Sequence, residues 1–447
     1  MVMPTFTTAP LMPPQAQLVD FAGNTHLVGD ATRFTGAGRV RLTAGILQTA
    51  GNAQIGTPTA PGNFEIAGGG LNPGSNSGGQ GITPTGSLVC SSGSTLYLTG
   101  GNIGGPINVQ AGGTANWTGG ELDGIWNIAA SGAILNIGGT GTRTIQAYGL
   151  ANYGNQNLPG VLNNAGTTIW SGTCNIDIQN RDTGTGTRGA INNSGTFIAQ
   201  NDQTFTGGGT FTNTGTLRKQ GSNGVTNFGE TYLSAVSLNN SGTLDIQSGI
   251  LSLNAINHNL RSGVVFSGAG RTRLNSGSFN AVGNFSFANG GTFELAGGNL
   301  SAPGGSTAVA PATFGDSGTF LWTGGEIDAV VNIGSATSLS MSSTADKTLN
   351  GYGQGNYGNV NQPGILNNAG TATWTGASNI VGQNGGNFGA LFNNQIGGVF
   401  NAQSGAGFNA NFSNAGIVNI GSASSLTVPG VFKLGVTLCR PPGEPLT

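Results

Sequence analysis

Short runs of alternating apolar and polar residues fill the chain, and a turn of Asn, Gly and Ser or Thr precedes many of them. The turn appears as NNSGTF from Asn192, TNTGTL from Thr212 and NNSGTL from Asn239. After the last of these, Leu244 and Ile246 fall on one face of an extended chain, and the polar residues between and beside them fall on the other. Asn and Gly tolerate positive φ. The pattern therefore predicts a turn followed by a strand with one buried face.

The turn recurs at a regular interval that suits a coil of two or three short strands. Strands this short cannot form a core alone, so successive coils must stack. No helical period interrupts the runs. The sequence predicts an all-β parallel β-helix with coils of about 20–29 residues, and the usual handedness of parallel crossovers predicts a right-handed one. The second polar position of the turn marks the coils at Asn164, Asn193, Asn213 and Asn240, and again at Asn368, Asn394 and Asn414.

The body of the chain is internally duplicated. FEIAGGGL from Phe64 matches FELAGGNL from Phe293, and WTGGELDGIWNI from Trp117 matches WTGGEIDAVVNI from Trp322. The separation between the copies is shorter in the second match by roughly 24 residues, about the length of one coil, so we expect the second copy to lack one whole coil. The predicted organisation is an irregular leader (1–17), repeat unit 1 (18–255), repeat unit 2 that is one coil shorter (256–432), and an irregular tail (433–447).

Composition narrows the function classes. Only 7% of the 447 residues are charged and the net charge is −2, so nothing favours nucleic acid or an anionic membrane as a partner. No apolar run is long enough to span a bilayer, and the N-terminus has no signal-peptide pattern. Cys90, Cys174 and Cys439 lack paired spacing, which predicts free thiols rather than disulfides or a zinc site.

Two carboxylate pairs recur, Glu121 with Asp123 and Glu326 with Asp328. Residues two apart on a strand point the same way. Such pairs serve as glycosidic acid and base or as calcium ligands, but a solvated outer face is the interpretation that we favour. No catalytic residue, metal ligand or cofactor is therefore predicted.

Basic residues recur in the same manner. Arg39 and Arg41 match Arg271 and Arg273, and we expect them to meet carboxylates on neighbouring coils; the alternative is contact with an anionic polysaccharide. The matching histidines, His26 and His258, have no acidic, Ser or Cys motif nearby, so we expect neither catalysis nor metal binding there.

One phrase, YGxxNYGNxNxPGxLNN, resembles its copy more closely than the strands around it do, and it is too rich in Gly and Asn to be a strand. Tyrosine faces beside amide donors can bind sugars, and the alternative is that the tyrosines fasten the loop to the solenoid. Asn side chains in the turns are predicted to form ladders along the coil axis, and Trp117, Trp170, Trp322 and Trp374 to pack at turns or in the core. The candidate glycan-binding residues are Tyr148, Asn152, Tyr153, Asn155, Tyr352, Asn356, Tyr357 and Asn359.

With its NNSGTL and WTGG phrases, the chain resembles the repeat regions of filamentous-haemagglutinin-like and autotransporter-passenger-like bacterial surface proteins. The resemblance covers nearly all of residues 18–430 and implies secretion, surface display and adhesion. The chain departs from that pattern because it shows neither an export signal nor a C-terminal barrel or sorting motif. Since both ends cut into repeats, we expect a fragment of a longer protein.

The predicted function is a non-enzymatic structural or adhesive module, extracellular or on the cell surface, that contacts polysaccharide or a host or neighbouring cell. Uncapped edge strands also predict end-to-end self-association. One alternative is a polysaccharide lyase or hydrolase on a β-helix, although the charged clusters of such enzymes are absent here. A second alternative is an ice-binding solenoid, which needs a sustained T-x-T column that TFTNTGT (210–216) only suggests.

Overall fold

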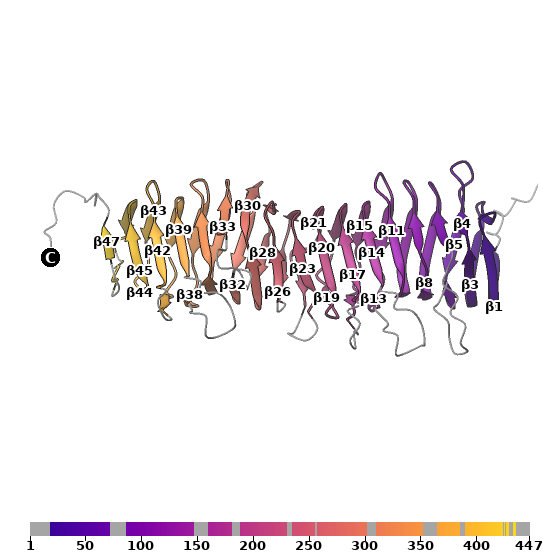
Figure 1. The fold of residues 1–447 in the computed structure, drawn as a ribbon, viewed down its shortest axis with the longest axis horizontal. Helices are drawn as coiled ribbons and strands as arrows, with labels where there is room; N and C mark the ends of the chain where they lie inside the picture. The colour runs from indigo at the N-terminus through magenta and orange to yellow at the C-terminus, as the bar shows by residue number, and fades with distance from the viewer. Residues whose placement is uncertain are drawn as a thin grey trace, which may run out of the picture.

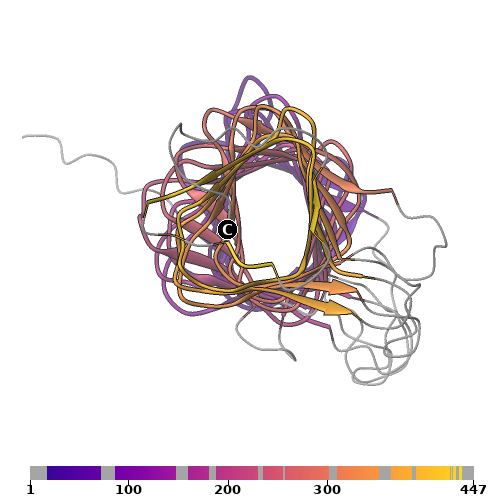
Figure 2. The ribbon, with the colours of Figure 1, turned by 90° about the vertical axis from the view of Figure 1, so that its left-hand side faces the viewer.

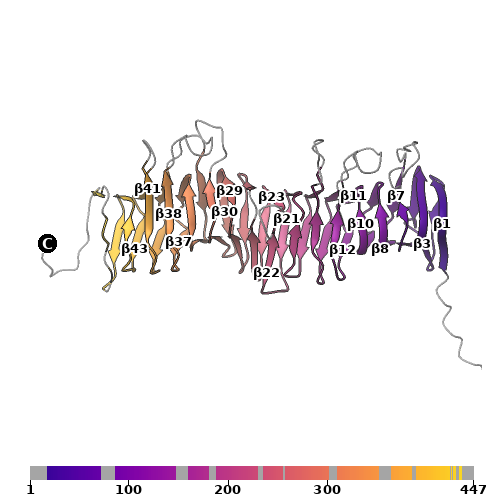
Figure 3. The ribbon, with the colours of Figure 1, turned by 90° about the horizontal axis from the view of Figure 1, so that it is seen from below.

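The strands of the computed structural model stack into one long, narrow rod (Figures 1 and 3). All its regular elements in the described ranges are β-strands. The predicted all-β class is confirmed. The structure describes residues 18–71, 86–146, 160–180, 188–229, 235–254, 257–301, 310–351, 364–384, 389–422, 424, 426–428 and 432–434.

Successive strands join three parallel ladders in turn, so that each coil places one strand on each ladder. Ladders 1 and 2 form one 31-stranded sheet, because β1, β3, β8 and β10 continue from one ladder to the next, and ladder 3 is a separate 16-stranded sheet. Seen end-on, the three ladders enclose the core (Figure 2). All the pairings between these strands are parallel, which confirms the predicted parallel β-helix.

Ladder 1 consists of β1 (Leu18–Gly29), β3 (Arg39–Ala50), β5 (Asn63–Ile66), β8 (Thr95–Ile103), β10 (Thr114–Leu122), β12 (Ile134–Ile137), β15 (Thr167–Trp170), β18 (Thr196–Ala199), β21 (Thr216–Lys219), β24 (Thr243–Ile246), β27 (Val265–Ser267), β30 (Gly283–Ala288), β33 (Ala312–Gly315), β36 (Val330–Ile333), β39 (Ile365–Asn368), β42 (Leu391–Asn394), β45 (Asn411–Asn414) and β47 (Phe432–Leu434). Ladder 2 consists of the second halves of β1, β3, β8 and β10 with β6 (Gly70–Leu71), β13 (Arg143–Ile145), β16 (Ile176–Ile178), β19 (Thr204–Thr206), β22 (Val225–Phe228), β25 (Ile250–Leu253), β28 (Arg271–Leu274), β31 (Thr292–Leu295), β34 (Thr319–Trp322), β37 (Ser338–Met341), β40 (Thr371–Trp374), β43 (Val399–Ala402) and β46 (Ile417–Ile420). Ladder 3 consists of β2 (Arg33–Phe34), β4 (Asn52–Ile55), β7 (Ser87–Cys90), β9 (Ile107–Val109), β11 (Ile125–Ile128), β14 (Val161–Asn164), β17 (Ala190–Asn193), β20 (Thr210–Asn213), β23 (Ser237–Asn240), β26 (Asn257–Leu260), β29 (Ser278–Ala281), β32 (Asn299–Ser301), β35 (Gly325–Asp328), β38 (Lys347–Gly351), β41 (Ile380–Asn384) and β44 (Phe408–Asn409).

The core is continuous because most strands bury every second side chain. Aromatic rings stack from coil to coil inside it, for example Phe205 on Phe228 with centroids 4.5 Å apart. Trp117, Trp170, Trp322 and Trp374 are fully buried, as predicted. Cys90 and Cys174 are buried and free, also as predicted, while Cys439 lies outside the described residues.

Buried asparagines form the predicted ladder at the corner between ladders 3 and 1. Asn164 donates to Asn193 over 2.7 Å, Asn193 to Asn213 over 2.6 Å, and Asn213 to Asn240 over 2.6 Å. Most of these amides also bond a backbone carbonyl of the next coil, as Asn193 does with Thr216. A second ladder of the same kind lies at the corner between ladders 1 and 2, at the residues predicted for the second copy, Asn368, Asn394 and Asn414.

Replacing Asn213 with Ala should lower the unfolding free energy by about 2–3 kcal/mol. The change removes two amide–amide hydrogen bonds and leaves buried partners on both sides without bonds. Urea denaturation measures it. The matched control is Asn192→Ala, because Asn192 lies on the exposed side of the same stack and donates to Asn163 in solvent. That change should cost less than about 1 kcal/mol. Equal costs at the two sites would contradict the prediction.

Coil length varies more than the turns suggest. The paired side chains Asn419 and Asn401 are 18 residues apart, whereas Asn163 and Asn127 are 36 apart. The range of coil lengths predicted from the turns is therefore too narrow. The coils of 35 or 36 residues contain segments 72–85, 147–159 and 352–363.

Matching phrases of the two copies lie on different ladders. The phrase of Phe64 is on ladder 1 in β5, and that of Phe293 is on ladder 2 in β31, nine coils further on. The phrase of Trp117 is on ladder 1 in β10, and that of Trp322 is on ladder 2 in β34, eight coils further on. The second match is thus separated by one coil less than the first, and both matches are displaced by one ladder. The boundaries of the two units stay a prediction.

Candidate functional site

The predicted glycan-binding residues lie outside the described residues. Tyr148, Asn152, Tyr153 and Asn155 belong to segment 147–159, and Tyr352, Asn356, Tyr357 and Asn359 belong to segment 352–363. The described residues on either side show where each segment joins the rod. The first runs from β13 on ladder 2 to β14 on ladder 3, and the second from β38 on ladder 3 to β39 on ladder 1.

The first carboxylate pair is held by amide side chains from the coils on either side. β10 turns from ladder 1 onto ladder 2 before Glu121, and it ends one residue before Asp123. Asn102, one coil earlier, donates to Asp123. Gln146, one coil later, donates to Glu121 over 2.5 Å. Four polar side chains from three consecutive coils thus meet at one place, which we call site 1.

The second carboxylate pair repeats this arrangement on ladder 3, and we call it site 2. Asn299 on β32 donates to Asp328 on β35 over 2.8 Å. Asn350 on β38 donates to Glu326 over 3.3 Å. The amide before and the amide after the carboxylate pair thus occupy the same relative positions as in site 1.

Asp123 is only 8% exposed, so the predicted solvated outer face is wrong for this residue. Burial raises the pKa of Asp123 to about 7; the hydrogen bond from Asn102 opposes this rise and the charge of Glu121 adds to it. Burial likewise raises the pKa of Asp328 to about 6. The hydrogen bond from Asn299 opposes this rise, and the charge of Glu326 adds to it. The cause is the corner itself, where neighbouring coils cover a side chain that alternation alone directs outward.

Sequence patterns identified the carboxylates but not the amides around them. Asn102 lies in TGGNI and Asn299 in AGGNL, each one coil before its carboxylate pair. The phrase is visible in the sequence when the coil before each carboxylate pair is compared between the two copies.

Other carboxylates of this protein are paired with arginine. Arg39 bonds Glu65 over 3.0 Å and Arg41 bonds Asp20 over 3.0 Å. In the second copy, both predicted arginines, Arg271 and Arg273, reach Glu294 at 2.6 and 2.7 Å. These contacts confirm that the basic residues meet carboxylates on neighbouring coils.

The two matching histidines differ in environment. His258 is fully buried, burial lowers its pKa to about 3, and its Nδ1 accepts a hydrogen bond from the backbone of Leu238 over 3.1 Å. His26 is partly exposed and bonds the carbonyl of Gly23 over 2.7 Å. The neutral imidazole of His258 therefore has a structural role.

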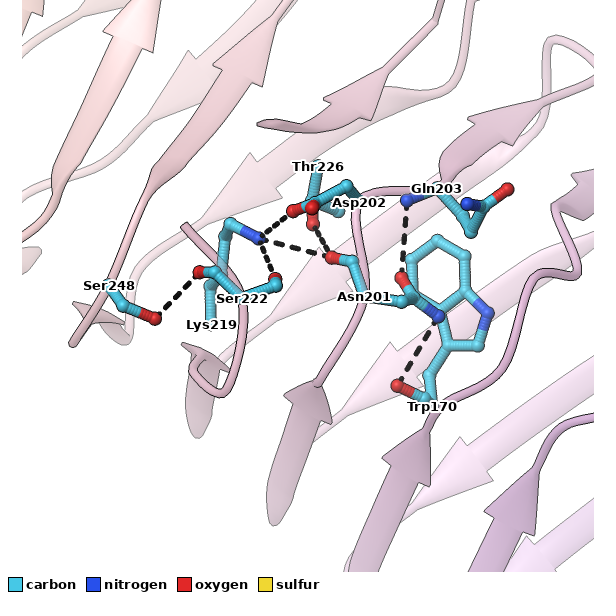
Figure 4. A network of polar contacts seen from close by, with 8 residues as sticks. All are labelled: Trp170, Asn201, Asp202, Gln203, Lys219, Ser222, Thr226 and Ser248. Carbon is cyan, nitrogen blue, oxygen red and sulfur yellow. Dashed lines mark hydrogen bonds and ion pairs between the residues drawn. The ribbon is translucent and has the colours of Figure 1, made fainter. Parts of the chain in front are cut away.

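A fully buried lysine was not anticipated. Lys219 at the end of β21 donates to the carbonyl of Asn201, to Asp202 over 2.8 Å and to Ser222 over 2.8 Å (Figure 4). Thr226 also donates to the Asn201 carbonyl. Burial alone would raise the pKa of Asp202, but its hydrogen bonds from Lys219 and Ser222 outweigh this and lower it. Through these bonds the lysine links its own coil to the preceding coil at a turn.

Replacing Asp202 with Asn should cost about 1–2 kcal/mol of unfolding free energy at pH 7. The buried ammonium would lose its carboxylate partner, although the 41% exposure of Asp202 keeps the loss small. Lys219→Met is the companion variant. It should change the free energy by less than about 1 kcal/mol, because Thr226 still bonds the Asn201 carbonyl and solvent can reach Asp202. Urea denaturation of both variants measures the change in unfolding free energy. A larger loss of unfolding free energy for Lys219→Met than for Asp202→Asn would contradict the prediction.

A shallow hollow of about 280 Å³ lies beside the Asn turns. Its lining includes Asn163, Asn192, Ser194 and Thr212, which offer amides and hydroxyls. The threonines of 210–216 do not form one T-x-T column, since Thr210 and Thr212 are on ladder 3 and Thr216 is on ladder 1.

Comparison with known proteins gives one match among solved structures. No family model matches the chain, and no curated protein matches it. The chain is similar to a crystal structure described as the TibC-catalyzed hyper-glycosylated TibA55-350 fragment, with 13% identity, coverage of 92% of this chain and 99% of that chain, and a TM-score of 0.24. A TM-score of this size does not establish a shared fold. Separately, no helix within the described ranges is long and apolar enough to cross a membrane.

Proposed function

We propose that this chain is a non-enzymatic structural or adhesive β-solenoid module of a cell-surface or secreted protein. The observation that carries the proposal is the uninterrupted stack from β1 to β47. At about 4.8 Å per coil, the stack extends for about 80 Å. Such a rod holds whatever its turns and loops carry at a distance from the place where it is attached.

The surroundings of the buried carboxylates support a non-enzymatic role. The carboxylates of sites 1 and 2 are bonded to amides, and the other buried acids of the described ranges are bonded to arginine. The described side chains that bond the carboxylates of sites 1 and 2 are amides. A polysaccharide lyase or hydrolase on a β-helix would gather its acids with Lys, Arg and His in one groove.

The location can be tested with an antibody raised against residues 191–253 and a blot of fractionated cells of the source organism. We expect the protein in the envelope or the medium. A band confined to the cytosol would overturn the proposal.

We further propose that the Tyr and Asn segments contact glycans. The purified chain should bind members of a glycan array, and the double variant Tyr153→Ala with Tyr357→Ala should lose that binding. Tyr97→Ala is the matched control, because Tyr97 lies on ladder 1 and stacks on Arg39 at 4.2 Å. Unchanged binding by the double variant would exclude these segments, and release of oligosaccharides from the glycans would favour an enzyme instead.

A further inference from the structure

Sites 1 and 2 are largely buried anionic sites without a cation from the protein. Within the described ranges, neither Glu121 and Asp123 nor Glu326 and Asp328 take part in any ion pair. The protein treats comparable buried acids differently, since Glu65, Asp245 and Glu294 each bond an arginine. Buried carboxylates are costly unless a positive charge accompanies them. Both sites therefore need a cation or a proton.

Each site also contains oxygen atoms that are buried and lack a hydrogen-bond partner. In site 1, Gln146 is only 4% exposed and its Nε2 reaches Glu121, yet its Oε1 has no partner. The Oδ1 atoms of Asn102 and Asp123 are buried without partners as well. Orphaned buried acceptors of this kind are rare in folded proteins. They lie on the same side chains that meet at the carboxylate pair.

Site 2, the counterpart of site 1 in the second copy, has the same orphaned atoms. Asn350 is fully buried and donates to Glu326, but its Oδ1 has no partner. The Oδ1 atoms of Asn299 and Asp328 are also buried and unpartnered. The duplicated phrases thus form the same set of orphaned atoms on two different ladders.

The donor set fits one class of ligand. Two carboxylates and two amides per site provide only oxygen, the donor that Ca²⁺ prefers, and Ca²⁺ accepts six to eight oxygens in flexible arrangements that include water. Neither site has a His or Cys ligand, which disfavours Zn²⁺ and similar ions. In the part of the chain that the structure describes, no group of three or more His, Cys, Asp or Glu could hold a metal ion, so amide oxygens must complete each site. Mg²⁺ demands a stricter octahedral geometry.

We propose that sites 1 and 2 each bind one Ca²⁺ ion through Glu121, Asp123, Asn102 and Gln146 in site 1 and through Glu326, Asp328, Asn299 and Asn350 in site 2. The ion neutralises the buried carboxylates and uses the orphaned oxygens. Its ligands come from three consecutive coils, so the ion links them, whereas Lys219 links two coils.

Calorimetric titration of the chelator-treated full chain with CaCl₂ tests the proposal. The parent should bind two Ca²⁺ per chain, Asp123→Asn one, Asp328→Asn one, and the double variant none. Asp245→Asn is the matched control, because Asp245 is a buried acid that already bonds Arg218, and this variant should still bind two. MgCl₂ at the same concentration should bind more weakly.

Thermal melting gives a second readout that does not depend on binding heat. CaCl₂ should raise the melting temperature of the parent and of Asp245→Asn, but leave that of the double variant unchanged. Circular dichroism confirms that each variant is folded, which is expected since Asn preserves the shape of Asp. No Ca²⁺ bound by the parent at 10 mM, or two ions still bound by the folded double variant, would overturn the proposal.

Discussion

Deleting residues 210–236 should leave a folded rod that is shorter by about 4.8 Å, the height of one coil. The deletion removes β20, β21 and β22, one strand from each ladder. Ser237 would then follow Gly209 and take the position of Thr210, its neighbour in the ladder. Asn240 would come to lie beside Asn193 and restore the inner column of amides. Lys219 is removed together with Ser222 and Thr226, and the partners that remain are the Asn201 carbonyl and the partly exposed carboxylate of Asp202.

Removal of a complete coil is tolerated because each coil of a solenoid contacts only its neighbours. Small-angle scattering of the purified variant should show a slightly reduced maximum dimension, and its urea midpoint should lie close to that of the parent. Unfolding need not be two-state in a stack of this length, so the midpoint and shape of the transition are compared rather than one extrapolated free energy.

The matched control deletes residues 210–222, which removes two strands instead of three. Every later strand would move to another ladder, and Asn240 would leave the column of Asn193. Breaking that column should cost about 2 kcal/mol or more, and the midpoint should fall accordingly. Equal midpoints for the two deletions would contradict the prediction, because they would show that strands can move to another ladder without loss of stability.

Raising the pH should weaken the Ca²⁺-free protein through Asp123 and Asp328. Their folded pKa values are about 7 and about 6, against an ordinary value of 3.8. A raised pKa means that the folded state holds a proton that the unfolded chain releases. The resulting stability is present below about pH 4 and is lost as the pH rises through about 6 and about 7. The differences correspond to at most about 4 kcal/mol for Asp123 and about 3 kcal/mol for Asp328.

Urea denaturation in EDTA between pH 5 and 8 measures this loss. The double variant Asp123→Asn with Asp328→Asn carries no proton to lose, so its stability should exceed that of the parent by an amount that grows with pH. Asp245→Asn should show no such growing difference. A parent and double variant with parallel pH profiles would contradict the raised pKa values. Added Ca²⁺ should restore the parent at high pH, since it supplies the missing positive charge.

Local pattern was sufficient to predict the architecture. The N-N-x-G turn identified the corner, and the positions marked from Asn164 to Asn240 and from Asn368 to Asn414 are the buried amides of the ladder. Alternation identified which side chains enter the core. These features repeat from coil to coil, so a single strand and its turn contain most of the information needed to predict the stacked coils.

What alternation could not predict depends on neighbouring coils. The direction in which Asp123 points follows from its place on the strand, but its burial depends on Asn102 in the coil before it and Gln146 in the coil after it. Lys219 is polar in the sequence and buried in the structure, because a turn of the preceding coil supplies acceptors for it. The candidate glycan residues lie outside the described ranges, so their role stays a prediction.

The displacement of the two copies by one ladder has a consequence for how a gene of this kind can grow. The phrase of Trp117 on β10 recurs at Trp322 on β34, eight coils and one ladder further along the rod. A whole copy can therefore stack on a different ladder, and the cost of the displacement falls on the columns that are broken at the junction, as in the shorter deletion. A third tandem copy with the same offset would place each strand on the remaining ladder, and a fourth would return it to the first.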